Sequence, residues 1–172
     1  MNKRENTVSM ADIRIRKRKR MRAKDVKTLS EDLAEVFGGV TIAEDDIVDR
    51  AESTDFDVIF VGNDILGMIY EDRPFLTVRG LLKYKPEKRF VTVDMGAVPY
   101  VTNGADVMGP GIVDADPDIR EGDMVWLRDV KNMVPLAVGV SLRDAAGLAS
   151  KDKGKAVTTL HNVGDKLWKS GE

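Results

Sequence analysis

Residues 98–112 read VPYVTNGADVMGPGI, a glycine-rich stretch of the kind that can hold a phosphate group. Gly104 and Gly109 have the separation that a P-loop needs between its two glycines. A P-loop continues with a lysine for the phosphates and a hydroxyl residue for magnesium, but here Pro110 and Gly111 follow. We therefore exclude a nucleotide-binding loop and expect the glycines to bring the backbone close to another group.

A second stretch suited to anion binding is residues 14–27, RIRKRKRMRAKDVK, which holds nine lysines and arginines against one acid. The whole chain has a net charge of −2, and acids dominate residues 44–57. A chain divided by sign in this way can bind a polyanion through one face, although a charge run can also be a solvated tail. Arginine suits phosphate oxygens, and the run lies beside a helix predicted below, so we expect an ordered basic patch. Its members are Arg14, Arg16, Lys17, Arg18, Lys19, Arg20, Arg22 and Lys24.

Residues for catalysis or metal binding are scarce. The chain has no cysteine and one histidine, His161, so thiol nucleophiles, cysteine–zinc sites and histidine-based triads lack their parts. Residues 114–118, DADPD, alternate acids as a calcium loop does, but Ile119 and Val125 stand where an EF-hand needs glycine and glutamate. No pair of carboxylates is singled out for glycosidase chemistry. We expect no enzyme activity, no cofactor and no metal.

The elements that would position these stretches can be predicted from apolar spacing. Residues 24–37 have helical spacing and end at two glycines, so they predict a helix. Apolar runs at 58–61 and 65–70 flank Gly-Asn-Asp and predict a hairpin. Residues 13–22 predict a short strand or an extended basic arm, and a short helix is expected within 76–82. The charged run 83–89, which contains a proline, is the best linker, with a boundary near residue 87.

After the linker the pattern changes to short strands separated by glycine turns. We expect a helix or turn at 97–102, an interrupted strand at 107–113, strands at 124–129 and 135–142, a small helix, and two closing strands at 156–163 and 165–168. This pattern is typical of a small β-barrel. We thus expect a disordered or frayed N-terminus (1–12), an α+β domain with the basic arm (13–87), and an all-β pseudobarrel with short helices (88–168).

The second half of the chain resembles the PUA domain, an RNA-binding pseudobarrel of pseudouridine synthases and archaeosine transglycosylases. The matching motifs are VTVDMGAVPYVTNGADVMGPGIVDAD (91–116), IREGDMVWL (119–127), PLAVG (135–139) and KGKAVTTLHNVGDKLW (153–168). Over residues 13–168 the chain resembles the archaeal branch of the malignant-T-cell-amplified-sequence family. That wider resemblance rests on RKRKRMRAKDVKTLSEDLAEVFG (16–38) and FLTVRGLL (75–82), with a departure at Thr77, where a Pro-Thr pair often precedes the helix.

The resemblance implies a non-enzymatic, ribosome-associated role in translation, binding tRNA or small-subunit rRNA in the cytoplasm. Eukaryotic relatives act with a protein partner, density-regulated protein. The resemblance also implies that RNA lies against residues 96–108, with lysines of the closing strands nearby. The implied RNA-binding residues are Gly96, Ala97, Tyr100, Asn103, Gly104, Ala105, Asp106, Val107, Met108, Lys153, Lys155 and Lys166.

Two other roles stay open. The chain could direct an RNA-modification enzyme to its substrate, or it could be an adaptor that binds a basic protein through the acidic residues 44–57. A membrane partner is not expected, because the longest apolar runs are far shorter than the ~20 residues that span a bilayer.

Overall fold

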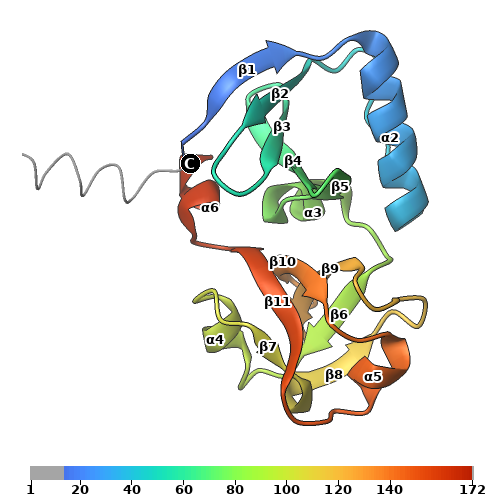
Figure 1. The fold of residues 1–172 in the computed structure, drawn as a ribbon, viewed down its shortest axis with the longest axis vertical. Coiled ribbons are helices and arrows are strands. Elements are labelled where there is room, and N and C mark those ends of the chain that lie inside the picture. Colours follow the sequence, from blue (N-terminus) through green and yellow to red (C-terminus); the bar gives the residue numbers. More distant parts are fainter. Residues whose placement is uncertain (1–13, 172) are drawn as a thin grey trace, which may run out of the picture. The chain divides into compact units, whose positions relative to one another are not determined.

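The computed structural model describes residues 14–171, so the expected disordered N-terminus (1–12) lies outside the described residues. The chain divides into two units (Figure 1). One unit runs to Tyr84 and takes up the chain again from Lys166, whereas the other consists of Lys85–Asp165. The first unit is therefore discontinuous in the sequence.

The first unit is built on a five-stranded antiparallel sheet in which neighbours in the sequence are neighbours in space. Its strands are β1 (Arg16–Arg20), β2 (Val48–Glu52), β3 (Asp57–Val61), β4 (Asp64–Tyr70) and β5 (Arg73–Leu76), and its helices are α2 (Ala23–Phe37), α3 (Val78–Tyr84) and α6 (Lys166–Ser170). The predicted strand in 13–22, the helix and the hairpin are confirmed. Strands β2 and β5 were not predicted.

Helix α2 is amphipathic and buries one side against the sheet. Leu29, Leu33 and Phe37 recur at helical spacing and are all buried. The ring of Phe37 meets that of Phe75 in β5, with 4.6 Å between the ring centroids. Gly38 then ends the helix in the left-handed conformation, with φ of 68°, as glycine does without steric cost. The C-terminal end of α2 is thereby fixed against β5.

The basic run forms the edge strand β1, and it is held by an acid from the acidic stretch. Asp49 in β2 is buried and accepts hydrogen bonds from Arg18 Nε at 2.8 Å and Arg20 Nε at 2.5 Å. The guanidinium of Arg18 also lies 3.7 Å from the centroid of the Phe60 ring and donates to the Gly62 carbonyl. The hydrogen bond from Arg20, helped by that from Arg18, outweighs burial and lowers the pKa of Asp49 below its ordinary value.

The second closing strand expected at 165–168 is wrong, because this segment is helix α6. Leu167 is buried in the core of the first unit with Ala51, Val58 and Phe60. Beside it, the guanidinium of Arg79 lies 3.9 Å from the centroid of the Trp168 ring, and its Nη2 donates to the Trp168 carbonyl at 2.9 Å. Two adjacent apolar residues can both pack on a helix but would point to opposite faces of a strand.

The second unit is a six-stranded sheet in the order β7-β11-β10-β9-β6-β8, in which only the β6–β9 pair is parallel. Its strands are β6 (Phe90–Val93), β7 (Val107–Met108), β8 (Ile112–Ala115), β9 (Met124–Asp129), β10 (Pro135–Ser141) and β11 (Lys155–Asn162). The helices α4 (Val98–Val101) and α5 (Ala145–Ala149) and a 3₁₀ turn at Gly109–Gly111 complete it. Among the helices that the structure describes, none is long and apolar enough to cross a bilayer.

We expect Asp49→Asn to lower the free energy of unfolding by about 1–2 kcal/mol at pH 7, because two charged hydrogen bonds lose their acceptor charge while both arginines stay partly solvated. Since the folded pKa of Asp49 is lowered, its contribution is present above the unfolded pKa of about 3.9 and is lost as pH falls through the folded pKa. The difference from the native protein should therefore shrink below about pH 4. Urea unfolding across this pH range measures it.

Asp45→Asn is the matched control, because it removes the same charge at an exposed position in the same stretch. Equal stability of the two variants at pH 7 would contradict the stabilising role of the Asp49 ion pairs.

Candidate nucleic-acid interface

The glycine-rich segment forms a tight turn that leads from α4 into β7. The carboxylate of Asp94 accepts a hydrogen bond from the Ala97 N–H at 2.9 Å just before α4. At the other end, Gly104 adopts φ of 88° and donates its N–H to the Val101 carbonyl at 3.0 Å. Most side chains disfavour that left-handed conformation, so glycine is required here for local geometry.

Strand β11 holds this turn at several points along its length. Asn162 Nδ2 donates to the Thr102 carbonyl at 2.9 Å. Thr159 donates its backbone N–H to Asp106 Oδ1 at 3.0 Å and its hydroxyl to the Ala105 carbonyl at 2.9 Å. The turn is therefore formed before any ligand arrives, which lowers the entropic cost of binding.

Asp106 carries the only charge of residues 98–112, and that charge is already paired. Lys155 Nζ lies 3.1 Å from Asp106 Oδ2. The backbone hydrogen bond from Thr159, and then Lys155, lower the pKa of Asp106 below its ordinary value. The acid therefore stays ionised at neutral pH, and its neutralised charge fastens the turn to β11.

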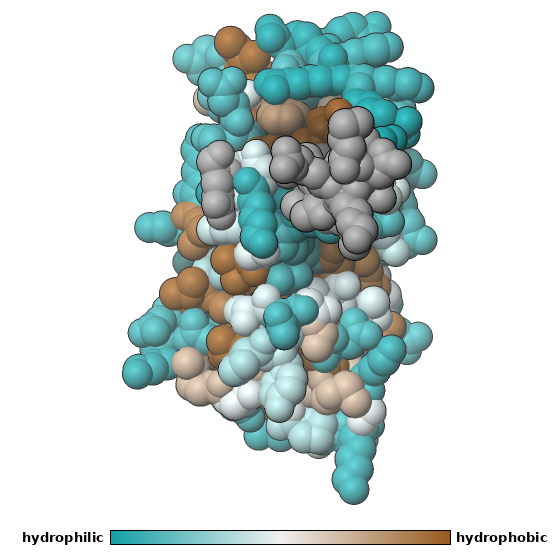
Figure 2. All heavy atoms as spheres, turned by 90° about the vertical axis from the view of Figure 1, so that its left-hand side faces the viewer, coloured by the Kyte–Doolittle hydropathy of each residue, from teal (hydrophilic) through white to brown (hydrophobic). Residues whose placement is uncertain are grey.

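The predicted RNA-binding residues divide into a surface group and a structural group. Tyr100 and Met108 expose 68% and 48% of their surface, whereas Val107 lies in the hydrophobic core. Exposed with the first two are Gly96, Asn103, Gly104, Ala105, Lys153 and Lys155, and Ala97 is half-buried. Lys166 was placed on a closing strand, which is wrong, since it begins α6 in the first unit. Figure 2, which views the side that carries α4 and β7, shows apolar and weakly polar atoms gathered over the second unit.

Arg143 is a positioning residue that the sequence did not reveal. Its Nη2 donates to the carbonyls of Lys153 and Gly154 at 3.1 and 3.2 Å. Gly109 donates its N–H to the same Gly154 carbonyl at 2.9 Å, and a Cβ added to Gly109 would lie 1.8 Å from the Asp152 carbonyl oxygen. Gly109 thus permits a backbone approach that no side chain would allow, and the loop that carries Lys153 is fixed beside β7.

The basic patch is exposed, but some of its side chains form ion pairs with acids of the first unit. Besides the pairing of Arg18 and Arg20 with Asp49, Arg22 lies 3.4 Å from Asp25, and Lys17 is only loosely paired with Glu52 at 3.9 Å. Within the described part of the chain, the patch members outside these ion pairs are Arg14, Arg16, Lys19 and Lys24.

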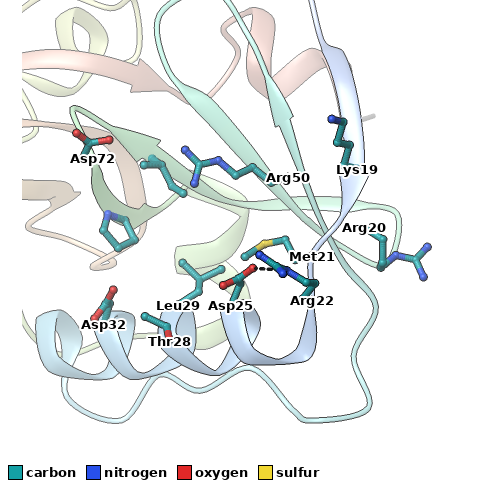
Figure 3. A pocket seen from close by; sticks show the side chains of 12 residues that line it. Lys19, Arg20, Met21, Arg22, Asp25, Thr28, Leu29, Asp32, Arg50 and Asp72 are labelled. Carbon is teal, nitrogen blue, oxygen red and sulfur yellow. Dashed lines mark hydrogen bonds and ion pairs between the residues drawn. The ribbon is translucent and has the colours of Figure 1, made fainter.

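A hollow of about 410 Å³ lies between the end of β1, the start of α2 and the β4–β5 turn (Figure 3). Lys19 lines one side of it, and Asp32 and Asp72 line the other. Because acids and bases both line this hollow, its charges do not favour an anion. The acidic stretch is likewise not one free surface, since Asp49 is buried under β1.

His161 is buried in β11, with its Nδ1 2.8 Å from Asp165 Oδ2. Within residues 14–171, His, Cys, Asp and Glu side chains form no group of three or more that could hold a metal ion.

Residues 89–163, which include α4, β7 and β11, match the model of the PUA domain. This defines the chain as a PUA-domain protein, and the predicted class of an α+β domain followed by a PUA-type pseudobarrel is confirmed. The chain is similar over most of its length to two archaeal proteins. It is 41% identical to an uncharacterised protein of Methanocaldococcus jannaschii, over 90% of this chain and 96% of that one.

The second is a hypothetical protein of Pyrococcus horikoshii, whose crystal structure superposes with a TM-score of 0.79 at 35% identity, over 91% of this chain and all of that one. A partial relative is eukaryotic translation initiation factor 2D of Rattus norvegicus, 41% identical over 42% of this chain but only 13% of the factor's length. The chain belongs to the malignant-T-cell-amplified-sequence family of PUA-domain proteins.

Gly109→Ala should destabilise the second unit by about 1–3 kcal/mol, because the new methyl group would displace the Asp152 carbonyl. Thermal or urea unfolding followed by circular dichroism measures the loss. Gly96→Ala is the control, since its Cβ would meet only Asp94 Oδ1, at an ordinary 3.4 Å. A Gly109→Ala variant as stable as Gly96→Ala would refute the close-approach role of Gly109.

Proposed function

We propose that this protein binds RNA in the translation apparatus, with tRNA or the rRNA of the small ribosomal subunit as its ligand. The observation that carries the proposal is the turn between α4 and β7, which β11 holds in place while its outer side exposes Tyr100, Met108 and glycine backbone. Membership of a PUA-domain family and the partial similarity to a translation initiation factor support it. The proposed role involves no catalytic step, and it places the protein in the cytoplasm.

The exposed turn offers the contacts that RNA recognition needs. The ring of Tyr100 can stack on an unpaired base, since every base has an aromatic face. Gly96 is exposed and has no side chain to hold ribose or phosphate away from its backbone. Lys153, on the loop fixed by Arg143 and Gly109, supplies a cation beside the turn. Together these groups would contact a nucleotide by stacking, close backbone approach and charge.

The basic patch would act differently, by attracting phosphates over a longer range. Arg16, Lys19 and Lys24 are exposed and take part in none of the ion pairs between described residues. Charges of this kind raise affinity without reading sequence, and counterion release makes their effect dependent on salt. A protein partner in translation would have to leave most of this patch, and the α4–β7 turn, accessible.

Binding to tRNA or to small-subunit rRNA fragments should weaken by about a hundredfold or more between about 50 and about 200 mM salt, because several phosphates are neutralised. Lys19→Ala should reduce the slope of log affinity against log salt by about 1. Lys131→Ala removes an exposed lysine from the β9–β10 turn of the other unit and should leave the slope unchanged. Fluorescence anisotropy titrations measure all three proteins, and affinity that is flat with salt would refute the role of the patch.

Tyr100→Ala should weaken RNA binding by about 5- to 100-fold through loss of stacking, whereas Tyr100→Phe should keep most of the affinity because it keeps the ring. Val113→Ala, a truncation at another exposed apolar residue of the second unit, serves as the control. The same titrations at fixed salt compare the variants. If Tyr100→Ala binds as tightly as Val113→Ala, RNA does not lie against the α4–β7 turn.

A further inference from the structure

The first unit has another candidate surface, made by other residues than the α4–β7 turn and different from it in chemistry. A groove of about 740 Å³ runs between α2 and residues 41–48 and ends at the last residues of β1. Its apolar lining comes from Met21, Val26, Ile42, Ile47 and Val48. The volume is within the range of ordinary ligand sites, and no described residue fills it.

Ile47 is exposed in this groove although its backbone is firmly held. It exposes 53% of its surface, more than any other branched aliphatic residue that the structure describes. Its carbonyl accepts the Gly62 N–H at 2.7 Å, and Ser30 Oγ accepts the Ile42 N–H at 2.9 Å. In the turn between them, Asp46 Oδ2 accepts the Ala43 N–H at 3.0 Å. The exposure of Ile47 therefore belongs to a preformed wall and does not come from a loose loop.

The spacing of the α2 residues along the groove favours a helical occupant. The α2 residues that line it fall at 23–24, 26–27 and 30–31, so they recur every three or four positions along one side of the helix. That side of α2 is about 12 Å long, at 1.5 Å per residue. A second helix lying along α2 could place apolar residues at spacings of three, four and seven in such a groove.

The two rims of the groove carry opposite charges over much of their length. Lys24 and Lys27 are exposed on the α2 rim, and Glu44 and Asp46 lie on the facing rim. These acids, together with Glu31, disfavour a phosphate backbone. The apolar side chains that line the groove are aliphatic residues and one methionine, and none of them has an aromatic ring on which a base could stack. The chemistry of this groove therefore fits a polypeptide and not RNA.

We propose that the groove between α2 and residues 41–48 binds an amphipathic helix of a partner protein. The apolar side of that helix covers Ile47, its acidic edge faces Lys24 and Lys27, and its basic edge faces Glu44 and Asp46. The charge pattern thus sets the direction in which the helix lies as well as its identity. This proposal does not depend on RNA binding at the α4–β7 turn, because none of the groove residues belongs to that turn. The groove shares Lys24 with the basic patch, so a bound helix would cover that lysine.

A display library of amphipathic helices about four turns long, panned on the full chain, tests the groove. Panning should enrich peptides with apolar residues at spacings of three, four and seven, acids on one edge and bases on the other. A synthetic peptide of the enriched sequence should bind at least about tenfold more weakly to Ile47→Asp, and to a double charge reversal of Lys24 and Lys27, in anisotropy titrations. Exchanging the acids and bases of the peptide should weaken its binding to the native protein similarly.

Leu82→Asp is the matched control, because Leu82 is an exposed aliphatic residue of the same unit outside the groove and should leave peptide affinity unchanged. RNA affinity of Ile47→Asp should also stay at the native value, so failure of the groove and failure of the RNA site are told apart. The proposal is overturned if no peptide is enriched, or if enriched peptides bind Ile47→Asp as well as the native protein. Self-association that Ile47→Asp abolishes would assign the groove to a second copy of the chain and would equally overturn it.

Discussion

The first unit depends on a single buried carboxylate placed under a strongly basic strand. Strand β1 consists of five consecutive basic residues at the edge of a sheet, where like charges repel and one side has no neighbouring strand. Asp49 in the neighbouring strand supplies the opposing charge, and the guanidinium of Arg18 lies over the ring of Phe60. Because Met21 follows β1 at once and donates its N–H to the Val48 carbonyl, the same pairing fixes where α2 begins. The basic surface and the groove along α2 thus share one structural origin.

The second unit uses an acid in a comparable way. Asp106 joins the α4–β7 turn to β11 through a backbone hydrogen bond and an ion pair with Lys155. Its charge is therefore paired within the protein and holds the turn in place. In both units, some residues whose charge suggests ligand binding instead hold neighbouring exposed residues in position. Charge that is left over after this pairing, on Lys19 or Lys153, is the part available to a polyanion.

Much of the fold could be predicted, because helix α2, the β3–β4 hairpin and most strands of the second unit follow from local spacing and glycine turns. What could not be predicted depends on partners far away in the sequence. Strand β2 reads VDRAE, and its pattern makes sense only once Arg18 and Arg20 are seen to cover Asp49. Helix α6 was mistaken for a strand because its burial comes from contacts made by Leu167 in a core formed more than a hundred residues earlier. Arg143 could not be predicted because its guanidinium donates to backbone carbonyls, which any residue type can provide.

Helix α6 also affects the order in which the chain can fold on the ribosome. Domains usually fold in the order in which they are synthesised, beginning at the N-terminus. Here the first unit lacks Leu167, and Arg79 lacks the Trp168 ring, until the whole of Lys85–Asp165 has been made. The second unit has all its residues before the first unit has its last. During synthesis, the basic strand and the groove along α2 therefore belong to an incomplete unit until the second unit is fully translated.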